Sequence, residues 1–171
     1  DLARRVGPDS LAADALIDAG MAILSDKEDW AAAEKYFKDG IEAARRADAP
    51  RVRARGSVNF ANLLRRQNRF AEALAYSREA FEYYSKNHFT AEEAQCAGAI
   101  ATDLIAQGKL EEAERTLEPY TSGKLASGAK GQKAMIEYQY ASVLEEREKF
   151  ADALTAYESS ADHFAGNALM V

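Results

Sequence analysis

An internal repeat of 40 residues constrains this sequence more than any other feature. When the chain is aligned with itself at a shift of 40, columns of matching residue types appear without an insertion. The clearest columns are Leu24, Leu64, Leu104 and Leu144; Trp30, Phe70, Leu110 and Phe150; and Ala33, Ala73, Ala113 and Ala153. A period of this length is typical of proteins in which each repeat is one supersecondary unit and neighbouring units stack.

Each repeat is predicted to be a pair of helices joined by a tight turn. The steps from Met21 to Leu24, from Trp30 to Ala33 and from Ala33 to Phe37 are three, three and four residues, which place these side chains on one helix face. The turn column is Glu28, Asn68, Gly108 and Glu148. Glycine and asparagine tolerate the left-handed conformation that ends many helices, so we expect two turns of this kind and a different ending in the other two repeats.

The composition favours an all-α fold, because alanine dominates the apolar residues and the chain has only 3 prolines. The expected helices cover residues 10–26, 29–47, 51–66, 70–86, 91–107, 110–121, 130–146 and 150–164. They form four repeats within one domain that covers residues 1–171, with the repeats at 10–49, 50–89, 90–129 and 130–165. The sequence begins with DLARRV and not with an initiator methionine, and we expect the chain to be a piece of a longer protein.

Two local signals concern helix ends in the third repeat. Thr90 followed by Glu93 has the spacing of a capping box at the start of a helix. Pro119 lies where the equivalent residues are inside a helix, so this helix is expected to kink or end early. The glycine-rich segment that follows, from Pro119 to Gly131, has two interpretations, a longer loop or a working hinge.

The repeats resemble the tetratricopeptide repeat, and the second shows this best with VNFANLLRRQNRFAEALAYSREAFEYY. The third repeat has AIATDLIAQGKLEEAERTL, the fourth YQYASVLEEREKFADALTAY and the first AGMAILSDKEDWAAAEKYF. The usual family period is about 34 residues. The longer period here is similar to that of kinesin light chains and of bacterial regulators. The resemblance implies a right-handed superhelical solenoid of four antiparallel helix pairs, in which the first helix of each pair (helix A) lines a concave groove.

Candidate binding residues follow from this resemblance. Asn59 and Asn62 match the asparagine-bearing helix A of long repeats, in which such side chains hold the backbone of a bound peptide. Arg55 and Arg66 share their helix face by spacing, and Tyr138 and Gln139 are candidates to continue the groove in the fourth repeat. The alternative interpretation is that all of them are ordinary solvent-facing polar residues.

The charge pattern bears on the partner. The net charge of −6 disfavours nucleic acid, since an acidic chain repels polyphosphate. Eight arginines lie within residues 45–69, opposed in that stretch of sequence only by Asp48, which suggests that this end of the groove accepts an acidic partner. The alternative is a solvated basic surface.

No motif in the sequence predicts a phosphate-binding, metal-binding or catalytic site. The spacing from Gly123 to Gly128 begins like a phosphate loop, but the ending that such a loop requires is missing. His88 and His163 have no second metal ligand at helical spacing, and Cys96 suits a packed helix face better than a nucleophile. We therefore expect no catalytic residue, metal or cofactor. The single cysteine and the lack of a bilayer-length apolar run fit a cytoplasmic protein.

The most direct prediction of function is a protein–protein interaction module that binds a peptide or protein segment in the concave groove, with no enzymatic activity. The alternative is a regulatory domain that senses a peptide and controls an attached effector or DNA-binding domain. The pattern predicts neither the identity of the partner nor the oligomeric state.

Overall fold

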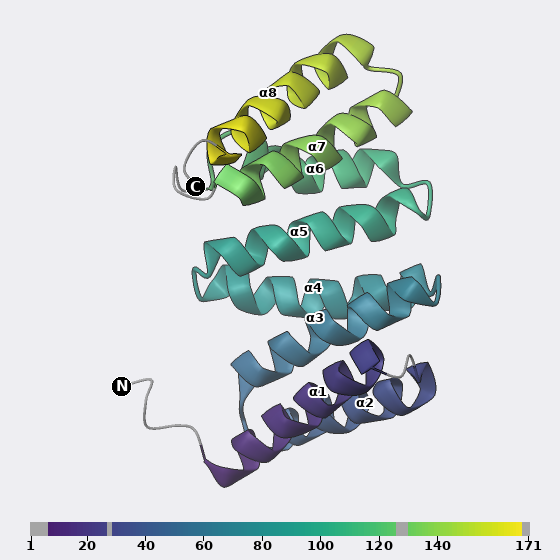
Figure 1. The fold of residues 1–171 in the computed structure, drawn as a ribbon, viewed down its shortest axis with the longest axis vertical. Coiled ribbons are helices and arrows are strands. Elements are labelled where there is room, and N and C mark those ends of the chain that lie inside the picture. Colours follow the sequence, from purple (N-terminus) through teal and green to yellow (C-terminus); the bar gives the residue numbers. More distant parts are fainter. Residues whose placement is uncertain (1–6, 27–28, 126–129, 169–171) are drawn as a thin grey trace. The chain divides into compact units, whose positions relative to one another are not determined.

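The computed structural model describes residues 7–26, 29–125 and 130–168. Within these ranges it contains eight helices and no strand (Figure 1). The chain divides into two compact units, Asp1–Tyr83 and Tyr84–Val171, which are described separately below. The boundary between the units lies near the end of the fourth helix.

The first unit consists of two helix pairs. Its helices are α1 (Pro8–Asp26), α2 (Trp30–Arg46), α3 (Pro50–Arg66) and α4 (Phe70–Lys86), the last of which extends across the unit boundary. Phe37 and Phe60 lie at the centre, with ring centroids 6.2 Å apart. The Phe60 ring also meets Tyr76 edge-on at 4.7 Å, so aromatic packing joins α2, α3 and α4.

The second unit has the same plan. Its helices are α5 (Thr90–Ile105), α6 (Leu110–Thr121), α7 (Lys130–Glu146) and α8 (Phe150–Ala168), and each packs against its neighbour in sequence. Helix α5 also packs against α7, so the first helices of both pairs are adjacent. The predicted helix bounds agree with the observed ones within about two residues, except that α8 extends to Ala168.

The repeat columns differ in how deeply their side chains are buried. The leucine column and the alanine column are buried in all four repeats. The small alanine side chain allows the two helices of a pair to approach closely. The aromatic column does begin each second helix (helix B), but Trp30 is 39% exposed and Phe150 is 65% exposed. Much of these two side chains thus lies on the surface and not in the core.

The turns are more uniform than the sequence predicts. Asn68 and Gly108 adopt the left-handed conformation as expected, but so does Glu148, with a φ of 60°. Asp48 and His88, in the turns between repeats, adopt it as well, so a left-handed residue recurs every 20 residues from Asp48 to Gly108. In each of these turns the residue that follows the left-handed one donates its backbone N–H to the carbonyl of the residue five positions before it, at 2.9 Å. This hydrogen bond satisfies a carbonyl at the helix end whatever the side chain. Glu28 lies outside the described residues.

Glu148→Gly is expected to stabilise the protein by about 0.5–1 kcal/mol. Glutamate pays a steric cost in the left-handed region that glycine avoids, and this gain exceeds the entropy that glycine loses on folding. Urea unfolding of both proteins measures the difference. Asn68→Gly is the matched control and should gain less, because asparagine tolerates this conformation. A lower midpoint for Glu148→Gly would contradict the strain.

Ion pairs link successive repeats within each unit. Glu34 of α2 lies 2.7 Å from Arg69 in the turn after α3, and Glu114 of α6 lies 2.8 Å from Lys149 in the turn after α7. The two pairs are 80 residues apart, whereas the second and fourth repeats carry Leu74 and Leu154 in the glutamate column. The sequence thus has a secondary period of two repeats, and each two-repeat block corresponds to one compact unit.

The third repeat ends differently from the others, as Pro119 predicts. Helix α6 has 12 residues, against 16 to 19 in the other helices, and it ends two residues after Pro119. Lys124, in the following segment, donates to Glu93 of α5 at 2.6 Å, and Leu125 is buried. The predicted capping box is wrong, because the residue before α5 is Phe89 and Glu93 instead accepts from Lys124 and Tyr120. Residues 126–129 lie outside the described residues, so the hinge stays a prediction.

Candidate functional site

The four candidate residues on α3 form a stripe along one face of the helix in the first unit: Arg55, Asn59, Asn62 and Arg66. The first of them, Arg55, already has partners within the chain. Arg55 donates to Asp14 at 2.6 Å and to Asp18 at 2.8 Å, both on α1. Burial by itself lowers the pKa of Arg55, but the hydrogen bonds to Asp18 and Asp14 outweigh it and raise the pKa above its ordinary value. Arg55 is therefore not an ordinary solvent-facing residue, since it joins two adjacent A helices.

The remaining stripe residues differ in exposure. Asn59 is half-buried, whereas Asn62 and Arg66 are exposed. The Asn62 side-chain oxygen accepts a hydrogen bond from Arg65, whose guanidinium also donates to Ser77 of α4. Asn62 therefore keeps its amide nitrogen as a donor for a ligand, and Arg66 adds a positive charge one helical turn later.

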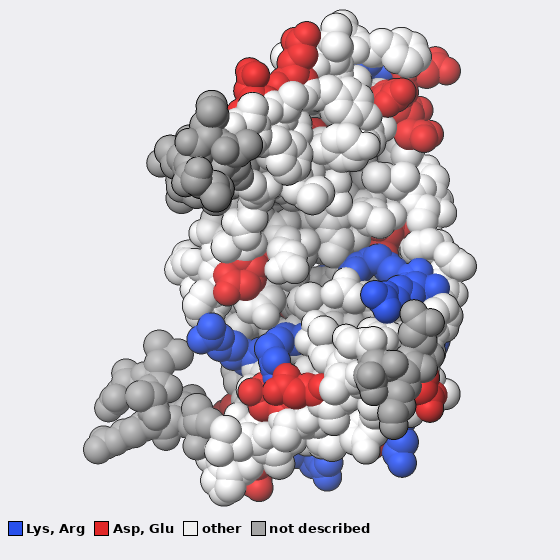
Figure 2. Space-filling model, viewed as in Figure 1, with Lys and Arg blue, Asp and Glu red and all other residues white. Residues whose placement is uncertain are grey.

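The arginine-rich segment is less basic in the folded chain than its sequence suggests. Tertiary structure supplies acidic neighbours that the local sequence lacks. Arg53 lies 2.8 Å from Glu79, and Arg69 donates to both Glu34 and Glu72. In the first unit, red and blue side chains accordingly lie next to each other on the face in Figure 2. Much of this positive charge is thus neutralised within the chain, which weakens the argument for an acidic partner.

Tyr138 and Gln139, the predicted site residues of the second unit, both lie on α7. Tyr138 is 52% exposed, and its ring meets Tyr157 of α8 edge-on at 5.5 Å. Gln139 points toward α5, where its amide nitrogen donates weakly to Thr102 at 3.4 Å. Only Gln139 of the two contributes to the pocket between these helices.

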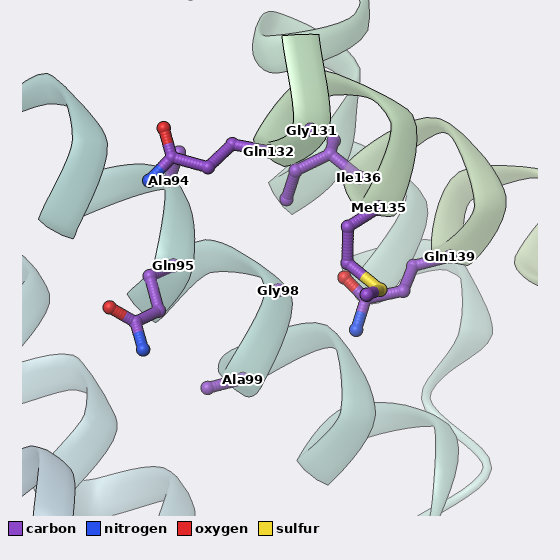
Figure 3. A pocket seen from close by; sticks show the side chains of 9 residues that line it. All are labelled: Ala94, Gln95, Gly98, Ala99, Gly131, Gln132, Met135, Ile136 and Gln139. Atoms are coloured by element: carbon purple, nitrogen blue, oxygen red, sulfur yellow. The ribbon is translucent and has the colours of Figure 1, made fainter. Parts of the chain in front are cut away.

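That pocket lies between α5 and α7 and has a volume of about 450 Å³. Figure 3 shows the side chains of Met135 and Gln139 extending from α7 toward Gly98 of α5. No lining side chain carries a charge; the lining residues are Ala94, Gln95, Gly98, Ala99, Gly131, Gln132, Met135, Ile136 and Gln139. The surface over α7 in Figure 2 is accordingly largely uncharged. A concave, mostly apolar pocket with a few polar groups is the usual form of a ligand site.

The repeat itself contains a signal for the pocket residues that were not predicted. Ala99 and Gln139 occupy the column of Asn59, and Gln95 and Met135 occupy the column of Arg55. Extending the predicted stripe along these columns would have placed α5 in the candidate site. The candidate residues predicted from the sequence lie only in the second and fourth repeats, although Gln95 of the third repeat is polar and shares the Arg55 column.

The residues considered for metal or nucleophilic chemistry have structural surroundings. Cys96 is buried in α5, and His163 contacts the buried Glu137 at 2.8 Å. His163 is thus not a simple surface residue. Among the residues that the structure describes, no group of three or more histidine, cysteine, aspartate or glutamate side chains is placed to hold a metal ion. In the same part of the chain, no helix combines the length and apolar character needed to cross a membrane.

Comparison with known proteins agrees with the helix pairs. Residues 52–119 match the family model of the tetratricopeptide repeat. The matched segment, from α3 to α6, is therefore similar in sequence to tetratricopeptide repeats. No curated protein matches it in sequence. Among solved structures, BtubC (BKLC) from P. vanneervenii superposes with a TM-score of 0.76 and 13% identity, over 85% of this chain.

This chain covers 60% of BtubC. At this identity the similarity concerns the fold alone, and it agrees with the predicted all-α solenoid of helix pairs. The tetratricopeptide match begins in α3 and ends in α6, so it includes both Asn62 and the α5 wall of the pocket. Tetratricopeptide repeats are a non-catalytic repeat family that generally mediates protein–protein interaction.

Proposed function

We propose that this tetratricopeptide-repeat chain is an interaction module that binds a peptide or protein segment along its A helices. The observation that carries the proposal is that α3 has one buried face and one exposed polar face. Ala61 and Leu64 of α3 are fully buried in the core of the first unit, while Asn62 and Arg66 of the same helix are exposed. Neither exposed side chain is needed for the core, so both are available to a ligand.

The chemistry of these side chains suits a bound main chain. The Asn62 amide nitrogen donates to a carbonyl, and Arg66 can hold a carboxylate or a carbonyl through its guanidinium. An acidic residue in the partner would pair with Arg66 in this first unit. Its contribution should be modest, because the arginine is exposed and most neighbouring arginines already have acidic partners.

The test begins with random linear peptides displayed on phage and selected against the intact chain. The double substitution Asn62→Ala with Arg66→Ala is expected to lower the affinity for the selected peptides by about tenfold, because two ligand contacts are lost. The melting temperature should hardly change. Calorimetry measures the affinity, and the part due to Arg66 should decrease in salt.

Lys35→Ala is the matched control. It removes an exposed basic residue from α2, a B helix of the same unit, and should leave the affinity unchanged. Failure to select any peptide would contradict the proposed function. Equal affinity of the double variant and the parent would remove α3 from the site.

A further inference from the structure

Helix α8 carries an apolar stripe on its surface. Five residues follow one another at steps of four, three, four and three, which places them on one face of the helix. These residues, here called the α8 stripe, are Phe150, Leu154, Tyr157, Ala161 and Phe164. Phe150, Leu154 and Phe164 are 65%, 59% and 45% exposed. A continuous apolar stripe on the surface is typical of an interaction site.

The repeat shows that this side of a B helix normally has a neighbour. Leu154 occupies the column of Glu114, and Glu114 of α6 pairs with Arg147 and Lys149 in the turn after α7. Helix α6 also packs against α7 itself. Among the described residues, α8 packs extensively against α7 alone, so its equivalent side is left open.

Carboxylates border the α8 stripe. Glu158 lies four residues after Leu154 and Asp162 four residues after Glu158, so both lie along one side of the stripe. From α7, Glu145 accepts a hydrogen bond from Tyr157 at 2.9 Å. Neither Glu158 nor Asp162 has an ion-pair partner among the described residues, and α8 contains no lysine or arginine. Over α8, Figure 2 shows acidic side chains next to an uncharged surface.

A further helix pair does not fit this surface in the way that α7 fits α5. Tyr138 of α7 occupies the column of Gly98 of α5, and its ring meets that of Tyr157. At Gly98 even a Cβ atom would lie 2.6 Å from the Gln139 side chain, so the close approach of α7 to α5 requires glycine. A tyrosine in this column keeps a neighbouring helix at a greater distance.

A second copy of the chain is disfavoured by charge. In a symmetric dimer the same face meets itself, which would bring together two acidic borders that each contain Glu158 and Asp162. Like charges that meet across an interface are unfavourable. The apolar stripe with its carboxylate border instead favours a partner with an apolar centre and basic edges.

From these observations we propose that the α8 stripe binds an amphipathic helix of a partner protein, whose lysine or arginine side chains pair with Glu158 and Asp162. From Phe150 to Phe164 the stripe is about 21 Å long, which matches a partner helix of about 15 residues. This inference goes beyond the proposed function and does not depend on it, because it concerns α8 and not the exposed face of α3.

The probes are three fluorescent synthetic peptides of about 15 residues. The first has leucine at helical spacing and lysine at every other position. The second has glutamate in place of lysine, and the third has the composition of the first without the helical spacing. Fluorescence anisotropy measures their affinity for the intact chain. The lysine peptide is expected to bind about tenfold more tightly than either of the others, and its affinity should fall as salt is added.

A substitution in the stripe locates the contact. Leu154→Ser should weaken the lysine peptide about tenfold, because an apolar contact is lost. Leu11→Ser is the matched control, since Leu11 of α1 is 58% exposed and Leu154 is 59% exposed. The control should leave the affinity unchanged. Circular dichroism should show the same helix content for both variants, because both leucines lie on the surface.

A second pair of variants tests the charges. Glu158→Gln combined with Asp162→Asn should weaken the lysine peptide about tenfold and reduce the salt dependence of its binding. Glu82→Gln combined with Glu118→Gln removes the same amount of charge from exposed positions on α4 and α6. This control should have little effect on the affinity.

Equal affinity for the lysine and glutamate peptides, or equal losses for Leu154→Ser and Leu11→Ser, would overturn the inference. The double variant at Asn62 and Arg66 should bind the lysine peptide like the parent, and a loss as large as that of Leu154→Ser would also overturn it. If phage-selected peptides bind through α3 but the lysine peptide does not bind, this inference fails and the proposed function stands. If no phage peptide is selected but the lysine peptide binds through Leu154, the reverse holds.

Discussion

Glu93→Ala is expected to lower the free energy of unfolding by about 3 kcal/mol. Glu93 is 3% exposed and accepts from the buried Tyr120 hydroxyl at 2.8 Å and from Lys124 at 2.6 Å. Alanine would leave the tyrosine hydroxyl without this partner and would release the segment after α6. Chemical denaturation measures the loss. Glu118→Ala, at an exposed position of α6, should change stability by less than about 0.5 kcal/mol.

The same carboxylate predicts a pH dependence. Burial by itself raises the pKa of Glu93, but hydrogen bonds from Lys124, Tyr120 and Ser85 outweigh it and hold the pKa below its ordinary value of 4.5. A depressed pKa in the folded state gives stability that is complete above pH 4.5 and is lost as the pH falls through the folded pKa. Glu93→Gln keeps an acceptor for Tyr120 and should flatten this part of the pH profile. An unchanged profile would contradict the role of Glu93.

Ala73→Leu is expected to destabilise the protein by about 2 kcal/mol through overpacking. Ala73 is fully buried in the core of the first unit, together with Phe60, Ala61 and Leu64. A leucine there must push α3 and α4 apart. Ala71→Leu, at an exposed position two residues earlier on α4, is the matched control and should have little effect. Equal melting temperatures for the two variants would contradict the close crossing at Ala73.

The helices were predictable because their signals are local and repeated four times. Leu64 and Ala73 recur with the same spacing in every repeat, so one correct assignment fixed all four. The turn residue was less predictable, since Glu148 adopts a conformation that its own preference disfavours. The hydrogen bond from Lys149 to the Leu144 carbonyl and the packing of α7 on α8 impose it. The capping box predicted at Glu93 is wrong for a similar reason. Local spacing does not show that Glu93 pairs with Lys124, which lies 31 residues away.

The candidate site was predicted only in part. Spacing placed Asn62 and Arg66 correctly on the exposed side of α3, and it selected Gln139, which lines the α5/α7 pocket. It did not show that Arg55 is bound by Asp14 and Asp18, which lie 41 and 37 residues earlier. Gly98 gave no signal at all, because its contribution is the absence of a side chain next to another helix.

By itself the sequence determined the all-α class, the four helix pairs and the buried alanine and leucine columns. Helical periodicity and repeat length act within a few residues along the chain, so they are visible without coordinates. Only tertiary structure decided which arginines are neutralised, where Glu93 finds its partners, and that the Gln139 side chain packs against Gly98. These features depend on contacts between helices that lie far apart in the sequence, and the packing of one helix on another sets them.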